Sequence, residues 1–378
     1  MGTAAVAANG KLNKAKLPPM DLPFLVLVVL VLISGLVMLF SASYAAGLAD
    51  EGDSMYYIKK QLLAAIIGVI AMFAASRLNY KFYRKLSWVA AAISALLLIL
   101  VFPMGVAANG AKRWIHLGLT FQPSEIAKIG MILILAHIIT VNYDKMATFT
   151  NGILIPLGIT GIFALLVIIE PHLSGAMLLA IIGVVMVFVG GANWKHLLLC
   201  FLVLLLCVVL IVSMTSYMGK RVSAWLDPWS DPQGEGYQII QSLYAIGSGG
   251  LMGLGLGNSQ QKYGYLPEAH NDYIFSIACE ELGFVGAVAI ILMFALLVWR
   301  GFHIALKAKD KFACLVCVGI MTQVGAQTLL NIAVVSNAIP STGISLPFFS
   351  YGGTSLVLLL VDMGVVLNVS RYSNTEKG

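Results

Sequence analysis

The sequence predicts an all-α polytopic membrane protein with ten transmembrane helices and a large extracytoplasmic loop between helices seven and eight. The first reason is composition. Charged residues make up 11% of the chain, against roughly 25% in soluble domains, while hydrophobic residues make up 60% and the mean hydropathy is +0.92. The second reason is that the apolar residues gather in runs near the ~20 residues that a helix needs to cross a bilayer.

Ten such runs follow one another along the chain. They are residues 23–43, 58–76, 87–105, 124–142, 152–169, 173–191, 197–216, 272–299, 312–334 and 345–369. The first run is too long for a signal peptide and has no small-residue cleavage site, so we expect it to remain as a spanning helix. Each run is expected to be helical because a spanning segment must satisfy its own backbone hydrogen bonds.

The basic residues predict the orientation. Cytoplasmic loops of membrane proteins carry an excess of Lys and Arg, and placing the N-terminus in the cytoplasm puts most of the 23 basic residues on that side. An even number of spans returns the C-terminus to the same side. We therefore expect a cytoplasmic tail over residues 1–22, one membrane domain over 23–369 with its extracytoplasmic loop at about 217–271, and a cytoplasmic tail over 370–378.

Several function classes are disfavoured. The net charge of +6 comes from residues in separate short loops, which does not indicate a nucleic-acid partner. The five cysteines lie in or beside apolar runs and are expected to pack as small apolar groups, and the histidines show no metal-ligand spacing. The Gly-rich stretch 247–257 has no strand before it and no Lys-Ser/Thr after it, so a nucleotide-binding loop is excluded.

The stretch Tyr265–Phe275 places Asp272 where the long polar loop meets the eighth apolar run. A carboxylate at this boundary is a candidate for chemistry on a lipid-linked substrate at the membrane surface. Glu268 and His270 lie beside it in the sequence, and His270 could orient or tune the acid. The alternative is that these three side chains only cap and solvate a helix end.

A second polar cluster surrounds the start of the fourth apolar run. It comprises Lys112–His116 and Gln122–Lys128, and Pro123 suits the first turn of a helix. Glu125 and Lys128 are three residues apart, so they share one helix face. An unpaired charge in the bilayer costs at least ~2.5–3.5 kcal/mol, which predicts that the two pair or face a watery cavity. A purely structural ion pair is the alternative.

Three further polar features stand out in the sequence. Lys220–Trp229 combines Arg221 with tryptophans, a pattern suited to lipid headgroups and to phosphates. Pro340–Gly353 is polar, uncharged and broken by Gly and Pro, which is typical of backbone that lines a cavity or packs against protein. Asp362 lies deep in the tenth run, and either a functional role or a buried structural hydrogen bond would account for it.

Together these residues resemble the SEDS family of ten-span bacterial glycosyltransferases, which polymerise peptidoglycan from lipid II. The resemblance covers roughly residues 30–371. The stretches that carry it are Gly35–Ser43, Gln122–Glu125, Gly236–Gln238, Tyr265–His270, Phe275, Glu280–Gly283 and Leu346–Gly353. Gly257–Lys262 is more similar to the FtsW branch of division and sporulation proteins than to the RodA branch of elongation proteins.

The chain departs from the family pattern at two places. Asn271 stands where Thr is common, with the following acid kept. Glu170–Gly175 replaces a common Gln-Pro-Asp-Leu-Gly run, so the family's aspartate has no counterpart here. His172 occupies that position and is not expected to inherit its role.

The resemblance implies that Asp272 is catalytic. It implies polymerisation of lipid II at the outer face of the bacterial cytoplasmic membrane, at the division septum, with a class B penicillin-binding protein and other division proteins as partners. No cofactor is identified, and a requirement for a divalent cation stays open. The residues expected to bind the lipid II and lipid-linked glycan substrates are Arg113, Gln122, Ser124, Glu125, Lys128, Arg221, Gln238, Glu268 and His270. The alternatives are a lipid II flippase, a RodA-like elongation polymerase and, least favoured, a non-catalytic division scaffold.

Overall fold

The computed structural model describes residues 18–108, 111–117, 119–200, 202, 222–234 and 236–373. Within these residues, eight helices are long and apolar enough to cross a membrane. They are α1 (Leu22–Glu51), α2 (Tyr56–Ala75), α3 (Tyr80–Met104), α4 (Pro123–Val141), α5 (Ile155–Ile169) with the preceding π-helical turn η2 (Thr150–Leu154), α10 (Ile274–Leu306), α11 (Lys311–Val335) and α12 (Gly353–Tyr372). The chain is therefore a predominantly helical, multi-pass membrane protein.

Two of the ten predicted spans are not among these eight helices. The helix α6 (Leu173–Val189) is apolar but shorter than the other spans. The predicted span 197–216 lies mostly outside the described residues, which show only its beginning as helix at 194–200. The number ten therefore stays a prediction.

The prediction for the last span was wrong at its start. Helix α12 begins at Gly353, and residues 345–352 are not helical. Pro347 disfavours a helical conformation at the residue before it, and Phe348 has a positive φ of 65°. The Ser350 Oγ accepts a hydrogen bond from the Leu346 amide at 2.7 Å, which closes this segment into a turn instead of a helix.

The all-α prediction also missed a small antiparallel sheet between α3 and α4. Its order is β1 (Gly105–Ala108), β2 (Ala111–Leu117), β3 (Leu119–Phe121). In its register Ile115 faces Phe121 and His116 faces Thr120. Strands of three to seven residues carry little periodic signal, and the polar Lys112–His116 cluster was interpreted as loop.

Short polar side chains start three of the long helices. The Asp21 carboxylate accepts from the Phe24 amide at 2.9 Å, the Asn79 side chain accepts from the Lys81 amide at 3.0 Å, and the Asp310 carboxylate accepts from the Ala313 amide at 2.9 Å. Each satisfies an amide that the first helical turn leaves without an intrahelical acceptor. These caps fix where α1, α3 and α11 begin.

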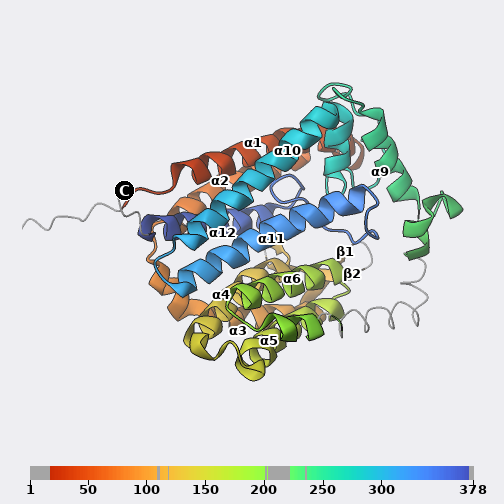
Figure 1. The fold of residues 1–378 in the computed structure, drawn as a ribbon. Coiled ribbons are helices and arrows are strands. Elements are labelled where there is room, and N and C mark those ends of the chain that lie inside the picture. Colours follow the sequence, from red (N-terminus) through yellow and green to blue (C-terminus); the bar gives the residue numbers. More distant parts are fainter. Residues whose placement is uncertain are drawn as a thin grey trace, which may run out of the picture.

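Figure 1 shows the long helices running in one general direction, with the sheet and α9 (Tyr237–Ser248) at one end and the C-terminal end of the described chain at the other. At the C-terminal end, Arg300 holds the Asp21 carboxylate through two hydrogen bonds of 3.0 and 2.7 Å. The Asp21 amide also donates to the Ser370 Oγ at 3.1 Å. The two ends of the described chain therefore meet at one end of the bundle, and the sheet and α9 mark the opposite end.

A buried ionic cluster anchors the loop that precedes α10. The Lys262 ammonium lies 2.9 Å from the Glu281 carboxylate, and both side chains are buried. Ser41 on α1 donates to the same carboxylate at 2.6 Å. Lys262 also donates to the Gly257 carbonyl at 2.6 Å. Because an uncompensated buried charge is costly, this cluster ties α1, α10 and the loop together.

We predict that the 249–271 part of this loop is extracytoplasmic and that both chain ends are cytoplasmic. Met252 is 79% exposed, so a cysteine there, in a variant lacking the native cysteines, should react with a membrane-impermeant maleimide in intact spheroplasts. Ser259 in the same loop is a poor labelling position because it is buried and donates to the Glu280 carboxylate. Labelling that requires permeabilised membranes would reverse the orientation.

Candidate functional site

Asp272 lies two residues before α10, in a turn whose backbone is held from two sides. The Asn331 amide group of α11 donates 2.7 Å hydrogen bonds to the carbonyls of both Asp272 and Ile344. The Ser350 hydroxyl donates to the Asn271 carbonyl at 2.7 Å. The segment 340–353 therefore braces the turn that carries Asp272.

Gly343 leaves the room that the Asp272 side chain needs. Its φ of +64° is in the left-handed region that favours glycine, and a Cβ at this position would lie 3.2 Å from Asp272 Oδ2. Substitution at Gly343 would strain the backbone and crowd the carboxylate. The broken 340–353 segment thus contributes to the site, as its composition predicted.

The Asp272 carboxylate borders a cavity of about 540 Å³, which we call the Asp272 cavity. Its wall comes from the small sheet, the N-terminal halves of α4 and α6, the start of α12, Gln327 on α11, and the turns before α10 and α12. Among the predicted site residues, it is lined by Arg113, Gln122, Ser124, Glu125, Lys128, Glu268 and Asp272. Segments far apart in the sequence therefore form one polar cavity.

The charged side chains of α4 and β2 that line this cavity have partners within the protein. Lys128 and Glu125 on α4 form a buried ion pair at 2.8 Å. The Ser355 hydroxyl donates to the Glu125 carboxylate at 2.9 Å, and Lys128 also donates to the Gln327 amide oxygen at 3.4 Å. Arg113 on β2 donates to the Pro171 carbonyl. The cavity therefore holds two cationic side chains, and one of them, Arg113, acts electrostatically on the Asp272 carboxyl.

The environment of Asp272 suits a proton acceptor. Burial and, to a smaller extent, the nearby Glu268 raise the pKa of its carboxyl to about 6, although Arg113 acts in the opposite direction. A base works best when its pKa lies near the operating pH, because it is then ionised and still binds a proton well. At neutral pH this carboxylate is ionised and able to accept a proton.

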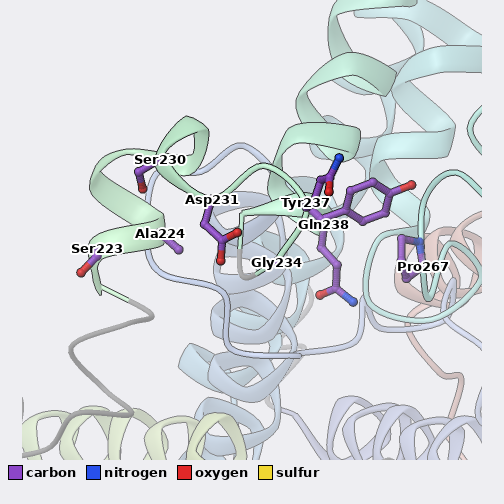
Figure 2. Close-up of a pocket in the computed structure, with 9 residues that line it drawn as sticks. Ser223, Ala224, Ser230, Asp231, Gly234, Tyr237, Gln238 and Pro267 are labelled. Carbon is purple, nitrogen blue, oxygen red and sulfur yellow. The ribbon is translucent and has the colours of Figure 1, made fainter.

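Two of the predicted site residues, His270 and Gln238, do not line this cavity, and a third lies outside the described residues. His270 packs its ring against Tyr57, with the ring centroids 4.5 Å apart, and does not line the cavity. Gln238 on α9 lines a separate cavity, shown in Figure 2. Arg221 lies outside the described residues. The sequence suggested proximity for His270, but its side chain points to an aromatic cluster that tertiary packing creates.

Other residues line the cavity without having been predicted. They include Asn271, His172, Gln327 and Tyr351. His172 lies 3.5 Å from the Gln122 amide nitrogen, and burial lowers the pKa of its imidazole to about 4, so it is neutral. In the sequence, His172 stands out because it departs from the family pattern, and Tyr351 lies in the stretch Leu346–Gly353 that carries the family resemblance. Gln327 lies inside an apolar run, where only its polarity could have indicated a role.

Glu170 lies within electrostatic range of Arg113, and the protonation state of its carboxyl can be tested. Its side chain is 1% exposed, and neither carboxylate oxygen has a hydrogen-bond partner. Burial raises the pKa of this carboxyl to about 8, although Arg113 acts in the opposite direction. At pH 7 the group is therefore mostly protonated.

We predict that Glu170→Gln keeps the folded protein stable and flattens its stability between pH 6 and 9. A carboxyl whose folded pKa is raised from 4.5 to about 8 favours folding fully below pH 4.5, and this contribution is lost as the pH rises through 8. The melting temperature of the wild type should fall over that interval, and that of the variant should not. Parallel curves would show that Glu170 is ionised or exposed.

In the described part of the chain, no three His, Cys, Asp or Glu residues group as a metal site. Asp362 on α12 is wholly buried, and the Gln323 amide lies 3.4 Å from its Oδ2. The structure therefore supplies a hydrogen-bond partner on α11 for this intramembrane acid.

Comparison with known proteins agrees with this architecture. A model of the FtsW/RodA/SpoVE family, described as "Cell cycle protein", matches residues 21–375. The chain is 44% identical to "Stage V sporulation protein E" of Bacillus subtilis (strain 168), over 93% of this chain and 97% of that protein. It is 39% identical to "Probable peptidoglycan glycosyltransferase FtsW" of Geobacter sp. (strain M18), over 93% and 96%.

Solved structures give the same result. One described as "Structural coordination of polymerization and crosslinking by a peptidoglycan synthase complex" has a TM-score of 0.80 and 33% identity, over 94% of this chain and 99% of that one. The rod shape determining protein RodA of Thermus thermophilus has a TM-score of 0.69 and 29% identity, over 94% and 98%. These matches confirm the resemblance seen in the sequence: the chain belongs to the FtsW/RodA/SpoVE family of cell cycle proteins.

Proposed function

We propose that this protein is a peptidoglycan glycosyltransferase that polymerises lipid II into glycan strands at the outer face of the cytoplasmic membrane. The observation that carries the proposal is the Asp272 carboxylate at the wall of a polar cavity that also holds Arg113 and Lys128. A cavity that holds a base and two cations matches a reaction in which an alcohol loses a proton and a pyrophosphate leaves. The names of the FtsW relatives support the same activity.

The bonds exchanged in this reaction assign a role to Asp272. The 4-hydroxyl of a GlcNAc attacks C1 of a MurNAc on a second lipid-linked chain, and its proton passes to the carboxylate. The new C1–O bond forms as the bond from C1 to the undecaprenyl pyrophosphate breaks, which inverts the α-linkage to β. General-base assistance of this kind contributes about 10²- to 10⁴-fold to a rate.

The leaving pyrophosphate needs positive charge. Arg113 is suited to it because a guanidinium can hold two phosphate oxygens at once. Lys128 supplies a second cation, which Glu125 holds in place on the same helix face at 2.8 Å. Arg221 remains a candidate for the same role. Together these residues would stabilise the negative charge that develops as the C1–O bond breaks.

The branch of the family suggests the cellular step. We infer a role in septal peptidoglycan synthesis, during division or sporulation, because sequence relatives named FtsW and Stage V sporulation protein E match over more than nine-tenths of the chain. A class B penicillin-binding protein is the inferred partner, in line with the structural neighbour that combines polymerisation and crosslinking.

A lipid II flippase is the main alternative. Transport would require charged groups along a path through the whole bundle, whereas the charged side chains that line the Asp272 cavity lie on the sheet, in the first two turns of α4 and in the turn before α10. The deciding experiment uses purified protein, its partner penicillin-binding protein and lipid II in detergent or nanodiscs. Formation of glycan strands supports the polymerase, and their absence with lipid II translocation in liposomes would support the flippase.

A further inference from the structure

A second cavity lies beside the Asp272 cavity and has no role in the chemistry described above. Its volume is about 730 Å³. We call it the Gln238 groove, and its lining residues are Ser223, Ala224, Ser230, Asp231, Gln233, Gly234, Tyr237, Gln238 and Pro267. Figure 2 shows the lining running from Ser223 on one side to Pro267 on the other. The volume is within the roughly 300–1,000 Å³ of small-molecule sites.

The walls of this groove are fixed to the bundle. The Trp225 indole donates to the Asn337 carbonyl at 3.0 Å, and the Asn337 side chain donates back to the Trp225 carbonyl at 3.2 Å. The Trp229 and Tyr244 rings pack edge to face with centroids 5.8 Å apart. These contacts join the segment before α9 to α9 itself and to the end of α11, so the groove is held in one shape.

The turn at residues 231–236, at the centre of the groove, leaves room for the Asp231 side chain. The amides of Gly234 and Gly236 donate to the Asp231 carbonyl at 3.3 and 3.2 Å. A Cβ at Gly234 would collide with the Asp231 carboxylate, and one at Gly236 with the Pro228 carbonyl. The two glycines therefore allow the chain to wrap around Asp231 and keep its carboxylate at the groove.

The chemistry of the lining favours a sugar. Its polar groups are hydroxyls, the amides of Gln233 and Gln238, and the Asp231 carboxylate, which together offer many donors and acceptors of hydrogen bonds. Neighbouring sugar hydroxyls and N-acetyl groups require that mixture. None of the described lining residues is cationic, so the partners that they offer suit neutral hydroxyl and amide groups.

The position of the groove connects it with the Asp272 cavity. Pro267 lines the groove and Glu268, the next residue, lines the Asp272 cavity. One turn of the chain thus forms part of the wall of both. A ligand that extends through the groove would reach the Asp272 cavity at this turn.

We propose that the Gln238 groove is a carbohydrate subsite that holds N-acetylhexosamine units of the glycan strand next to the Asp272 cavity. The identity of the sugar rests on the proposed function. The groove binds the strand through Gln238, Asp231 and Tyr237, and it keeps the strand attached between successive additions. Weakening this site therefore shortens the strands that are made before the product dissociates.

The test uses the full chain with its partner in nanodiscs, and lipid-free (GlcNAc–MurNAc)₂ tetrasaccharide as the probe. Gln238→Leu should weaken tetrasaccharide binding about tenfold, because a tenfold change corresponds to about 1.4 kcal/mol, near the upper end for one hydrogen-bonded group. Asp231→Asn tests a second wall of the groove in the same way. Gln241→Leu is the matched control, since Gln241 lies on the same helix and lines neither cavity.

The outcomes separate this proposal from the proposed function. Asp272→Asn should bind the tetrasaccharide as the wild type does, and Gln238→Leu should make shorter strands while Gln241→Leu makes strands of normal length. No binding by the wild type, equal binding by Gln238→Leu, or competition by inorganic pyrophosphate at the groove would overturn the subsite. If the wild type binds the tetrasaccharide specifically but makes no strands, the subsite proposal stands and the proposed polymerase activity is refuted. Melting temperatures of all variants identify any loss that arises from misfolding.

Discussion

Replacing Asp272 by Asn should abolish glycan polymerisation while the protein still folds and still binds its partner. The amide keeps the size of the carboxylate but cannot accept the proton of the attacking hydroxyl. We expect a loss of about 10²- to 10⁴-fold, the usual contribution of a general base, and Asp272→Ala should lose at least as much. Strand formation from lipid II, followed on gels, is the measurement.

Stability and pH dependence provide the controls for this prediction. Because burial raises the folded pKa from 3.8 to about 6, the protonated carboxyl favours folding below pH 3.8, and this contribution is lost as the pH rises through 6. Asp272→Asn should therefore melt no lower than the wild type at pH 8. The wild-type rate at low substrate should fall tenfold for each pH unit below about 6. Wild-type-like polymerisation by the Asn variant would remove the general-base role.

Removing one partner of the Glu125–Lys128 pair should destabilise the protein more than removing both. The Lys128 side chain is 5% exposed and that of Glu125 is 14% exposed, and their charged atoms lie 2.8 Å apart. Loss of one leaves a buried charge without its partner, at about 3–5 kcal/mol. Lys128→Met and Glu125→Gln should each lower the melting temperature, and the double variant should recover most of it.

The double variant also separates structure from function. If Lys128 holds the substrate pyrophosphate, the double variant should fold and yet make no strands, which is the result we expect. Lys59→Met is a suitable control because its ion pair with Asp53 is exposed at 66% and 44%, where pairs contribute little. A stable and fully active double variant would make the pair purely structural and leave Asp272 and Arg113 to carry the chemistry.

The long helices could be predicted from the sequence because each is a run of apolar residues that is several turns long. Their starts were less certain, since α12 begins at Gly353 and not at 345, where Pro347 and the positive φ of Phe348 prevent a helix. The sheet at β1–β3 was missed for a related reason. Strands of three to seven residues are too short to give a period, and pairing between them stabilises what no single strand indicates.

The site was predictable where polarity conflicts with its surroundings. Asp272, Glu125 and Lys128 are charges beside or within apolar runs, and placing them there is costly unless they pair or face water. Gln122 and Ser124 came from the family resemblance. The structure places all five on one cavity, although the sequence alone contains no information about their distances.

What the sequence determined by itself is the class of protein, its long helices and the acid at the head of α10. Hydropathy and charge act locally, so they can be evaluated along the chain. Tertiary structure decided which polar side chains meet. It turned His270 toward Tyr57, placed Gln238 in a second groove and brought His172 and Gln327 to the Asp272 cavity. These contacts join residues up to about 200 positions apart, as with Lys128 and Gln327, and only the packing of whole helices against one another selects them.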